Sequence, residues 1–265
     1  MWVNMKDFAF VIQLIFGFYP RKIIRRLRSL PWFIRSKRRF IKLQNANGRH
    51  DFGITGNFPC LLDRNEEGGS ASGHYFHQDL WVAQEIAKTD PACHVDIGSR
   101  IDGFVAHVAS FRKIEVFDIQ DITPEIPNVK FVKADCMSND FRWTDYCDSV
   151  SSLHAIEHFG LGRYGDPLDP DGHIKGLNNI CKMLKQGGLF YFSVPIGAQR
   201  IEFNAHRVFS VRYLLDYFKG KYEIEQFSFV DDKGNFHRNV TLDEDMINGN
   251  CRCRFGCGIF VMRKK

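Results

Sequence analysis

Glycine and aspartate residues spaced for recognition of a nucleoside lie between residues 94 and 135. Gly98 directly follows an apolar segment, and a residue without a side chain lets a ligand approach the backbone there. Asp118 lies 20 residues beyond Gly98 at the end of a second apolar segment, and Asp135 ends a third. An acid at that spacing can accept hydrogen bonds from both ribose hydroxyls. The spacing therefore predicts a cofactor that contains a nucleoside.

The first loop, GSRIDG at residues 98–103, narrows the choice of cofactor. It lacks the Lys and Ser/Thr of a phosphate-binding P-loop, and it does not spell the GxGxxG of dinucleotide-binding folds. S-adenosylmethionine carries no phosphate and needs only ribose, adenine and amino-acid contacts, so we predict it as the cofactor. The expected cofactor-binding residues are Asp96, Gly98, Arg100, Gly103, Asp118 and Asp135.

The chain around these residues alternates between strand and helix patterns. Apolar and β-branched runs predict strands at residues 93–97, 113–119, 129–135, 148–156, 188–195, 222–230 and 256–264. Helical patterns occupy residues 103–111, 172–184 and 210–218, with Gly187 and Gly188 expected to stop the second helix and Ser210 to cap the third. This alternation predicts an α/β fold with a mostly parallel sheet, and ligands of such sheets bind at the carboxyl ends of the strands.

The loop at residues 157–173, EHFGLGRYGDPLDPDGH, follows the fourth strand and carries side chains suited to group transfer. Methyl transfer is an in-line displacement that mainly needs positioning, and a hydroxyl acceptor also needs a base. The predicted catalytic residues are His158, Asp166 and Asp169, and the predicted substrate contacts are His77, Tyr164, His206 and Arg207. Two alternatives stay open: His158 would merely cap the strand and line the cofactor, and Asp166 would order the loop.

Residues from about 90 to 263 resemble class I S-adenosylmethionine-dependent methyltransferases. The resemblance rests on the motifs VDIGSRIDG, VFDI, VKAD, SSLHAIEHFG and MLKQGGLFYFSVP in this order. The string LHAIEHFGLGRYGDPLDPDGHIKGLNNICKMLKQGG, with SGHYFHQDLWVAQEI upstream, is more narrowly similar to the methyltransferase-like domain-of-unknown-function 268 family. The resemblance implies a Rossmann-like sheet of seven strands with the last antiparallel. It also implies methyl transfer to a saccharide or nucleotide-sugar intermediate of cell-surface polysaccharide synthesis.

The first loop departs from the methyltransferase pattern. The second glycine falls one place late, at Gly103, and Asp102 occupies the expected glycine position. Arg100 would either bind the cofactor carboxylate or pair with Asp102 and narrow the pocket. A non-catalytic scaffold for a membrane glycosyltransferase is therefore the alternative function. A nicotinamide-dependent sugar oxidoreductase is disfavoured because the glycine fingerprint is missing.

Residues 1–50 differ in charge from the rest of the chain. The net charge is +5, yet this segment alone holds twelve Lys and Arg against the single acid Asp7. Residues 51–265 consequently carry a net charge of −6, which disfavours a nucleic-acid partner. We predict an N-terminal arm at residues 1–50 and a methyltransferase-like domain at residues 51–265.

The arm combines an apolar run with a basic amphipathic pattern. The run Phe8–Tyr19 would rise about 18 Å as a helix, too little to cross a bilayer. Nine basic residues then alternate with apolar ones from Arg21 to Arg39. Residues 8–42 are therefore predicted to bind an anionic membrane surface, placing a cytoplasmic protein on its inner face. Packing on the body or on a second subunit, and an RNA contact, are the alternatives.

The eight cysteines follow no disulfide spacing, which favours a reduced, cytosolic chain. Cys251, Cys253 and Cys257 near the end are expected to share one face of a strand and to pack in the core. No CxxC pair accompanies them, so no metal site is predicted.

Overall fold

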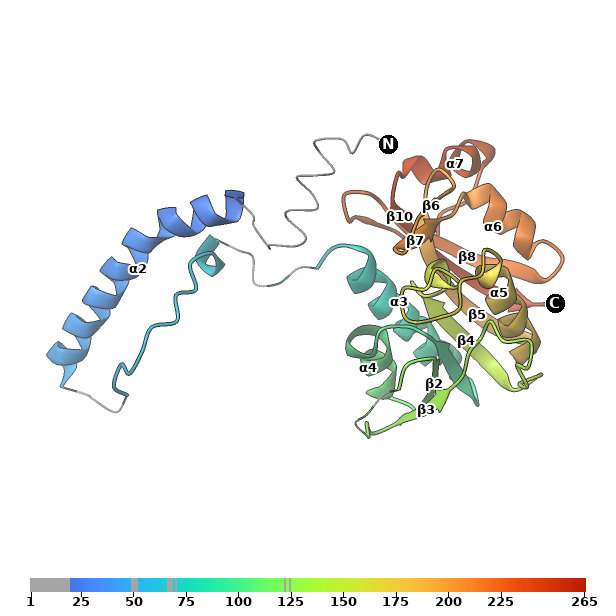
Figure 1. The fold of residues 1–265 in the computed structure, drawn as a ribbon, viewed down its shortest axis with the longest axis horizontal. Coiled ribbons are helices and arrows are strands. Elements are labelled where there is room, and N and C mark those ends of the chain that lie inside the picture. The colour runs from blue at the N-terminus through green and yellow to red at the C-terminus, as the bar shows by residue number, and fades with distance from the viewer. Residues whose placement is uncertain (1–19, 49–51, 66–68, 70, 122, 124) are drawn as a thin grey trace. The chain divides into compact units, whose positions relative to one another are not determined.

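The computed structural model describes residues 20–48, 52–65, 69, 71–121, 123 and 125–265 (Figure 1). The chain divides into a first unit that ends at Ser70 and a second unit, Ala71–Lys265. The boundary expected between residues 50 and 51 lies inside the first unit. The apolar run Phe8–Tyr19 lies outside the described residues.

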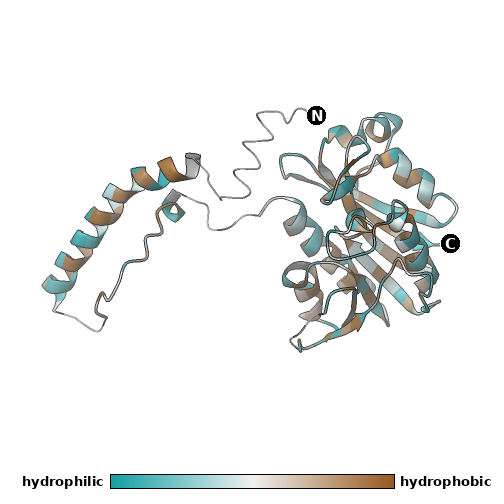
Figure 2. Cartoon of the chain, viewed as in Figure 1, coloured by the Kyte–Doolittle hydropathy of each residue, from teal (hydrophilic) through white to brown (hydrophobic). Residues whose placement is uncertain are grey.

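The described residues of the first unit form the long helix α2 (Pro20–Asn47) and a short 3₁₀ turn, η1 (Asp63–Asn65). Apolar residues recur along α2 at helical spacing, and Figure 2 shows them interrupted by polar ones. We define the α2 stripe as Ile23, Leu27, Leu30, Ile34 and Ile41, whose exposed fractions are 36%, 59%, 37%, 45% and 38%. Within the described part of the chain, no helix is both long and apolar enough to cross a membrane.

The second unit is built on one eight-stranded sheet in the order β3-β2-β1-β4-β5-β10-β8-β9. Its strands are β1 (His94–Ile97), β2 (Ile114–Asp118), β3 (Val129–Lys133), β4 (Cys147–Leu153), β5 (Leu184–Ile196), β8 (Tyr222–Val230), β9 (Phe236–His237) and β10 (Gly256–Lys264). Strands β1 to β5 are parallel, and β10 is antiparallel to both β5 and β8. The predicted mostly parallel sheet with an antiparallel last strand is confirmed. The sequence pattern did not predict the two-residue β9, which adds an eighth strand.

Helices cover both faces of the sheet, as expected. One face carries α3 (His74–Thr89), the π-helical turn η2 (Ile101–Val105) and α4 (Ala106–Ala109), and the other carries α5 (Gly172–Met183) and α6 (Val211–Phe218). The remaining elements are η3 (Ile156–His158), the hairpin of β6 (Arg200–Glu202) and β7 (His206–Val208), α7 (Glu244–Asn248) and η4 (Asn250–Arg252).

Two helix ends test the sequence prediction. Ser210 caps α6 as predicted, because its hydroxyl accepts a hydrogen bond from the Tyr213 N–H at 3.2 Å. Gly187 and Gly188 do not stop α5, which ends at Met183. Leu184 is already extended and begins β5, so both glycines lie within that strand.

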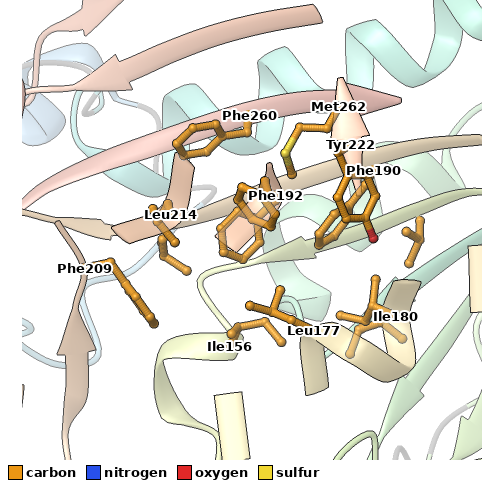
Figure 3. Packing of buried hydrophobic residues seen from close by; sticks show 14 of the residues in the cluster. Ile156, Leu177, Ile180, Phe190, Phe192, Phe209, Leu214, Tyr222, Phe260 and Met262 are labelled. Carbon is orange, nitrogen blue, oxygen red and sulfur yellow. The ribbon is translucent and has the colours of Figure 1, made fainter. Parts of the chain in front are cut away.

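The core consists of two apolar layers, one on each face of the sheet. Figure 3 shows the larger layer, in which Phe190, Phe192 and Phe260 pack against the helices. Cys251 and Cys253 belong to this layer, whereas Cys257 on β10 belongs to the layer beneath α3 and α4. The prediction that the three cysteines share one face is therefore wrong, since only Cys257 lies in a strand. All eight cysteines are free thiols.

Truncation of Phe192 is expected to destabilise the second unit strongly. Its ring is fully buried and lies within 5.3 Å, 5.4 Å and 6.1 Å of the rings of Phe190, Phe218 and Phe260. Phe192→Ala leaves a cavity there and should lower the free energy of unfolding by about 3–5 kcal/mol in urea denaturation. Phe203→Ala, at a site that is 74% exposed, should change it by less than about 0.5 kcal/mol. Equal effects would contradict this description of the core.

Candidate active site

A cavity of about 600 Å³ opens at the carboxyl ends of β1, β2 and β4, within the size range of small-molecule sites. Eight predicted residues line it: Gly98, Arg100, Asp118, Asp135, His158, Tyr164, Asp166 and His206. Five others lie outside its lining: Asp96, Gly103, His77, Asp169 and Arg207. The parallel topology thus gathers four of the six cofactor candidates at one edge, together with part of residues 157–173, which we call the transfer loop.

Asp96 lies beneath the cavity and fixes its floor. Its carboxylate is fully buried and accepts hydrogen bonds from the Ser99 N–H at 3.0 Å and the Ser99 hydroxyl at 2.6 Å. A third bond at 2.6 Å comes from the Ser151 hydroxyl on β4. Burial raises the pKa of Asp96 to about 6, against these hydrogen bonds, which favour the charged form. Asp96 therefore ties the glycine loop to β4 from below.

The ends of β1, β2 and β3 are aligned by backbone hydrogen bonds. Gly98, with a φ of 67°, donates to the Phe117 carbonyl at 3.0 Å, and Ala134 donates to the Asp118 carbonyl at 2.9 Å. The Asp118 carboxylate accepts the Gln120 N–H at 2.8 Å, and burial raises its pKa. The Asp135 carboxylate likewise accepts a hydrogen bond from the Met137 N–H at 2.8 Å. Two carboxylates and a glycine in the left-handed conformation thus border one side of the cavity.

Arg100 pairs with Asp102 at the mouth of the cavity. Its Nε and Nη2 atoms donate to the two Asp102 carboxylate oxygens at 3.1 Å and 2.8 Å, and its guanidinium lies 4.8 Å from the Tyr75 ring centre. Of the two alternatives for Arg100, these contacts match pairing with Asp102. Gly103 instead packs against α3, where a Cβ atom would clash with Asp79 Oδ2.

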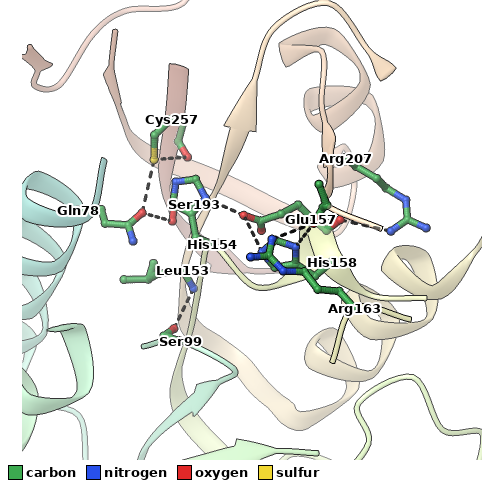
Figure 4. Close-up of polar contacts among 12 residues, drawn as sticks. Gln78, Ser99, Leu153, His154, Glu157, His158, Arg163, Ser193, Arg207 and Cys257 are labelled. Carbon is green, nitrogen blue, oxygen red and sulfur yellow. Dashed lines mark hydrogen bonds and ion pairs between the residues drawn. The ribbon is translucent and has the colours of Figure 1, made fainter. Parts of the chain in front are cut away.

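A buried histidine–carboxylate pair lines the cavity just beyond the end of β4 (Figure 4). His154 Nδ1 lies 2.6 Å from Glu157 Oε1, and their side chains are 5% and 2% exposed. Burial opposes charge on the His154 ring, but the adjacent Cys257 and Glu157 groups raise its pKa well above the ordinary value. His154 has a φ of 51°, a conformation that is rare for a residue with a side chain.

His158 lies beside this pair and has a defined tautomer. Its Nδ1 is 2.6 Å from the Ala205 carbonyl oxygen, which can only accept, so Nδ1 carries the proton. Burial lowers the pKa of His158, which favours the neutral ring. The lone pair is then on Nε2, 3.7 Å from Glu157 Oε1. A neutral imidazole with a free ring nitrogen suits a proton acceptor.

The transfer loop is held by its own polar groups. Asp166 accepts hydrogen bonds from the N–H groups of Gly160, Gly162 and Tyr164 at 2.8 Å, 3.1 Å and 3.1 Å. These contacts favour the loop-ordering alternative for Asp166; a substrate contact stays a prediction. Asp169 pairs with Lys175 at 2.6 Å, away from the cavity lining.

Arg207 is buried beneath the same loop. Its side chain is 4% exposed and donates to the carbonyls of Phe159 at 2.5 Å and Pro170 at 3.1 Å. The desolvation of burial lowers its pKa. The Arg207 guanidinium donates to backbone carbonyls. This predicted substrate contact therefore lies under the loop and outside the cavity lining.

The other predicted substrate contacts separate in the structure. His206 lines the cavity with its ring 4.8 Å from that of Phe255, and Tyr164 packs edge-on to His158 at 5.4 Å. His77 instead stacks on Phe236 at 5.2 Å, outside the lining. Sequence reasoning missed the cavity residues His154 and Phe255. His154 and Glu157 are three residues apart around a strand end, a spacing that signals a local pair; Phe255 gives no such signal.

Several solved structures are similar to this chain. The solved structure of the [4+2]-cyclase SpnF is similar at a TM-score of 0.50 and 12% identity, covering 74% of this chain and 85% of that one. A Burkholderia thailandensis 1,6-didemethyltoxoflavin-N1-methyltransferase with bound S-adenosylhomocysteine follows at 0.48 and 14%, covering 72% and 84%. The NodS N-methyltransferase from Bradyrhizobium japonicum WM9 reaches 0.46 and 10%, covering 77% and 91%. The second unit therefore has a Rossmann-like α/β fold similar to that of SpnF.

Residues 106–264 match the family described as "Caenorhabditis protein of unknown function, DUF268". This chain belongs to that family, as its motifs predict. No curated protein matches it.

Removal of the Arg207 guanidinium should loosen the transfer loop. Arg207→Ala leaves several buried carbonyls without donors, so the free energy of unfolding should fall by about 3 kcal/mol. Amide hydrogen exchange at residues 160–171 should accelerate. The control, Arg163→Ala, removes an exposed arginine with one bond to the Ala205 carbonyl and should leave both measurements near wild type. An unchanged exchange rate in Arg207→Ala would rule out this role.

Proposed function

We propose that the protein transfers a methyl group from S-adenosylmethionine to a hydroxyl group of a saccharide or nucleotide-sugar intermediate of cell-surface polysaccharide synthesis. The observation that carries the proposal is the cavity, where Gly98, Asp118 and Asp135 border one side and neutral His158 borders the other. The class I methyltransferase fold supports the cofactor. The saccharide class rests on the sequence resemblance.

The proposed roles follow from the cavity walls. Asp118 would accept hydrogen bonds from the ribose hydroxyls, Asp135 would contact the adenine edge, and Gly98 would let the amino-acid part approach the backbone. The acceptor oxygen would attack the methyl carbon in line with the carbon–sulfur bond. The bond electrons stay on sulfur to give S-adenosylhomocysteine, and the hydroxyl proton passes to His158 Nε2.

The acceptor side of the cavity combines apolar and cationic surface. Phe159, Phe255 and Tyr164 offer ring faces for the C–H surfaces of a sugar, and Arg163 offers an exposed cation. Arg163 lies 5.2 Å from the Tyr164 ring centre and donates to Ala205 at 3.1 Å. An acceptor that carries phosphate would pair with Arg163, since Arg207 is committed to the loop.

The open cavity favours catalysis over the scaffold alternative. The contacts of Arg100 with Asp102 and Tyr75 keep its guanidinium at the mouth, and about 600 Å³ remains behind it. A scaffold would need no such space. Binding of the cofactor decides between the two.

Asp118→Ala should abolish cofactor binding without unfolding the chain. Wild-type protein is expected to bind S-adenosylmethionine and S-adenosylhomocysteine with micromolar affinity in calorimetric titration, and not NADH. Loss of the ribose acceptor should weaken binding more than about 100-fold. Asp121→Ala, an exposed acid paired with Lys133 at 2.7 Å, is the matched control and should bind like wild type. A folded wild-type chain that binds neither adenosine ligand would support the scaffold instead.

For the N-terminal arm we propose docking to an anionic membrane surface, with a membrane glycosyltransferase as a possible neighbour. The α2 stripe is exposed over about five helical turns. The described α2 side chains include Arg25, Arg26 and Arg28 near its start and Lys37, Arg38 and Arg39 further along. An apolar face beside basic residues matches the interface of an anionic leaflet.

Two acids placed on the α2 stripe should abolish membrane binding, whereas the same acids on the opposite face should not. Leu27→Asp with Ile34→Asp removes apolar contact and adds charge, so binding to phosphatidylserine vesicles should fall more than about 100-fold in cosedimentation. The control is Ser29→Asp with Ser36→Asp, which has the same spacing and charge on the other face. It should lose only a few-fold. Equal losses for both pairs would reject insertion of the stripe.

A further inference from the structure

Three potential metal ligands meet beside the cavity from distant parts of the chain. They are His74, the first residue of α3, His154, which follows β4, and Cys257 on β10. One nitrogen of each histidine and the Cys257 sulfur all lie within 4.8 Å of one another. The two imidazole rings are stacked with centres 5.2 Å apart. The cluster is thus a product of the fold and not of a sequence motif.

The free nitrogen of His154 points into this cluster. The His154 side chain is only 5% exposed, and its Nε2 atom is buried with no hydrogen-bond partner among the described residues. An unpaired buried nitrogen costs free energy, so it needs a reason. The other nitrogen, Nδ1, is held by Glu157 at 2.6 Å. A carboxylate behind a histidine whose second nitrogen is free is the arrangement that orients metal-binding imidazoles.

The remaining two ligands are also held from behind. The Cys257 thiol donates to Gln78 Oε1 at 3.5 Å, and Gln78 in turn accepts the Ser193 hydroxyl at 2.7 Å (Figure 4). The His74 ring stacks on the Phe255 ring with centres 5.6 Å apart. Each of the three candidate ligands therefore has a partner that fixes its orientation.

We propose that His74, His154 and Cys257 bind a zinc ion. Two imidazoles and one thiolate suit Zn²⁺, and three protein ligands with an open fourth position are typical of catalytic zinc. Zinc–nitrogen and zinc–sulfur bonds of about 2.0–2.3 Å place ligand atoms about 3.5 Å apart, so the cluster must contract by about 1 Å. His74 can supply this movement because it is only partly buried and begins its helix.

Binding would exchange protons for the metal. Zinc replaces the proton of the Cys257 thiol and the proton that His154 Nε2 carries when that ring is charged. Both protons are released to solvent, so the affinity should fall as the pH is lowered. His74 and His154 line the cavity, whereas Cys257 does not, so the open position would face the cavity. This site uses none of the proposed ribose and adenine contacts. The zinc proposal therefore does not depend on the proposal for the cofactor.

The test is calorimetric titration of the full, chelator-treated chain with zinc chloride, paired with cobalt(II) spectroscopy. One equivalent of zinc should bind, and cobalt should give a thiolate charge-transfer band with the visible bands of a tetrahedral ion. His74→Ala, His154→Ala and Cys257→Ala should each weaken zinc binding by more than about 100-fold, and Glu157→Gln by about 10–100-fold. Cys257→Ala should also remove the charge-transfer band.

Cys253→Ala is the matched control. Cys253 is also buried, at 7% exposed, but belongs to the apolar layer on the other face, so this variant should bind zinc like wild type. If Cys257→Ala fails to fold, the partly exposed His74→Ala decides. Absence of one-equivalent binding by wild type, or equal affinities for wild type and His74→Ala, would overturn the proposal. Asp118→Ala should retain zinc, which separates failure of this site from failure of the cofactor site.

Discussion

One fully buried carboxylate, that of Asp96, determines the geometry of the whole site. A buried charge persists only where hydrogen bonds compensate for lost hydration, and Asp96 receives three, from Ser99 twice and from Ser151 once. The Ser99 hydroxyl also accepts the Leu153 N–H at 3.0 Å, as Figure 4 shows. The glycine loop and the end of β4 are therefore locked together. His154 directly follows Leu153, the last residue of β4, and its side chain is buried.

The two sides of the cavity have different physical origins. The side with Gly98, Asp118 and Asp135 follows from aligned parallel strands, whose ends meet at one edge whatever the sequence between them. The side with His154 and His158 depends on Glu157 of η3, on the Ala205 carbonyl of the β6–β7 hairpin and on Cys257 of β10. A fold of this type supplies the first side and leaves the second to each family, so the second side must decide the reaction.

Sequence patterns predicted what depends on local order and missed what depends on long-range packing. Strand ends placed Asp118 and Asp135 correctly because periodicity locates strands, and their carboxyl ends share an edge. The location of Arg207 could not be predicted, because burial under the loop reflects carbonyls from residues 159 and 170. The meeting of His154 with Cys257 depends on insertion of β10 between β5 and β8, which no local pattern encodes.

Rigidity is distributed unevenly around the cavity, and this bears on how a ligand enters. The transfer loop is already ordered by partly buried hydrogen bonds to Asp166 and Arg207, so it needs no ligand to form. The mouth is held by exposed contacts of Arg100 with Asp102 and Tyr75, which are worth little in water. The first turn of α3 is therefore the part best able to move. That turn also carries His74, so a metal bound there would fasten the first turn of α3 to the end of β4 and to β10.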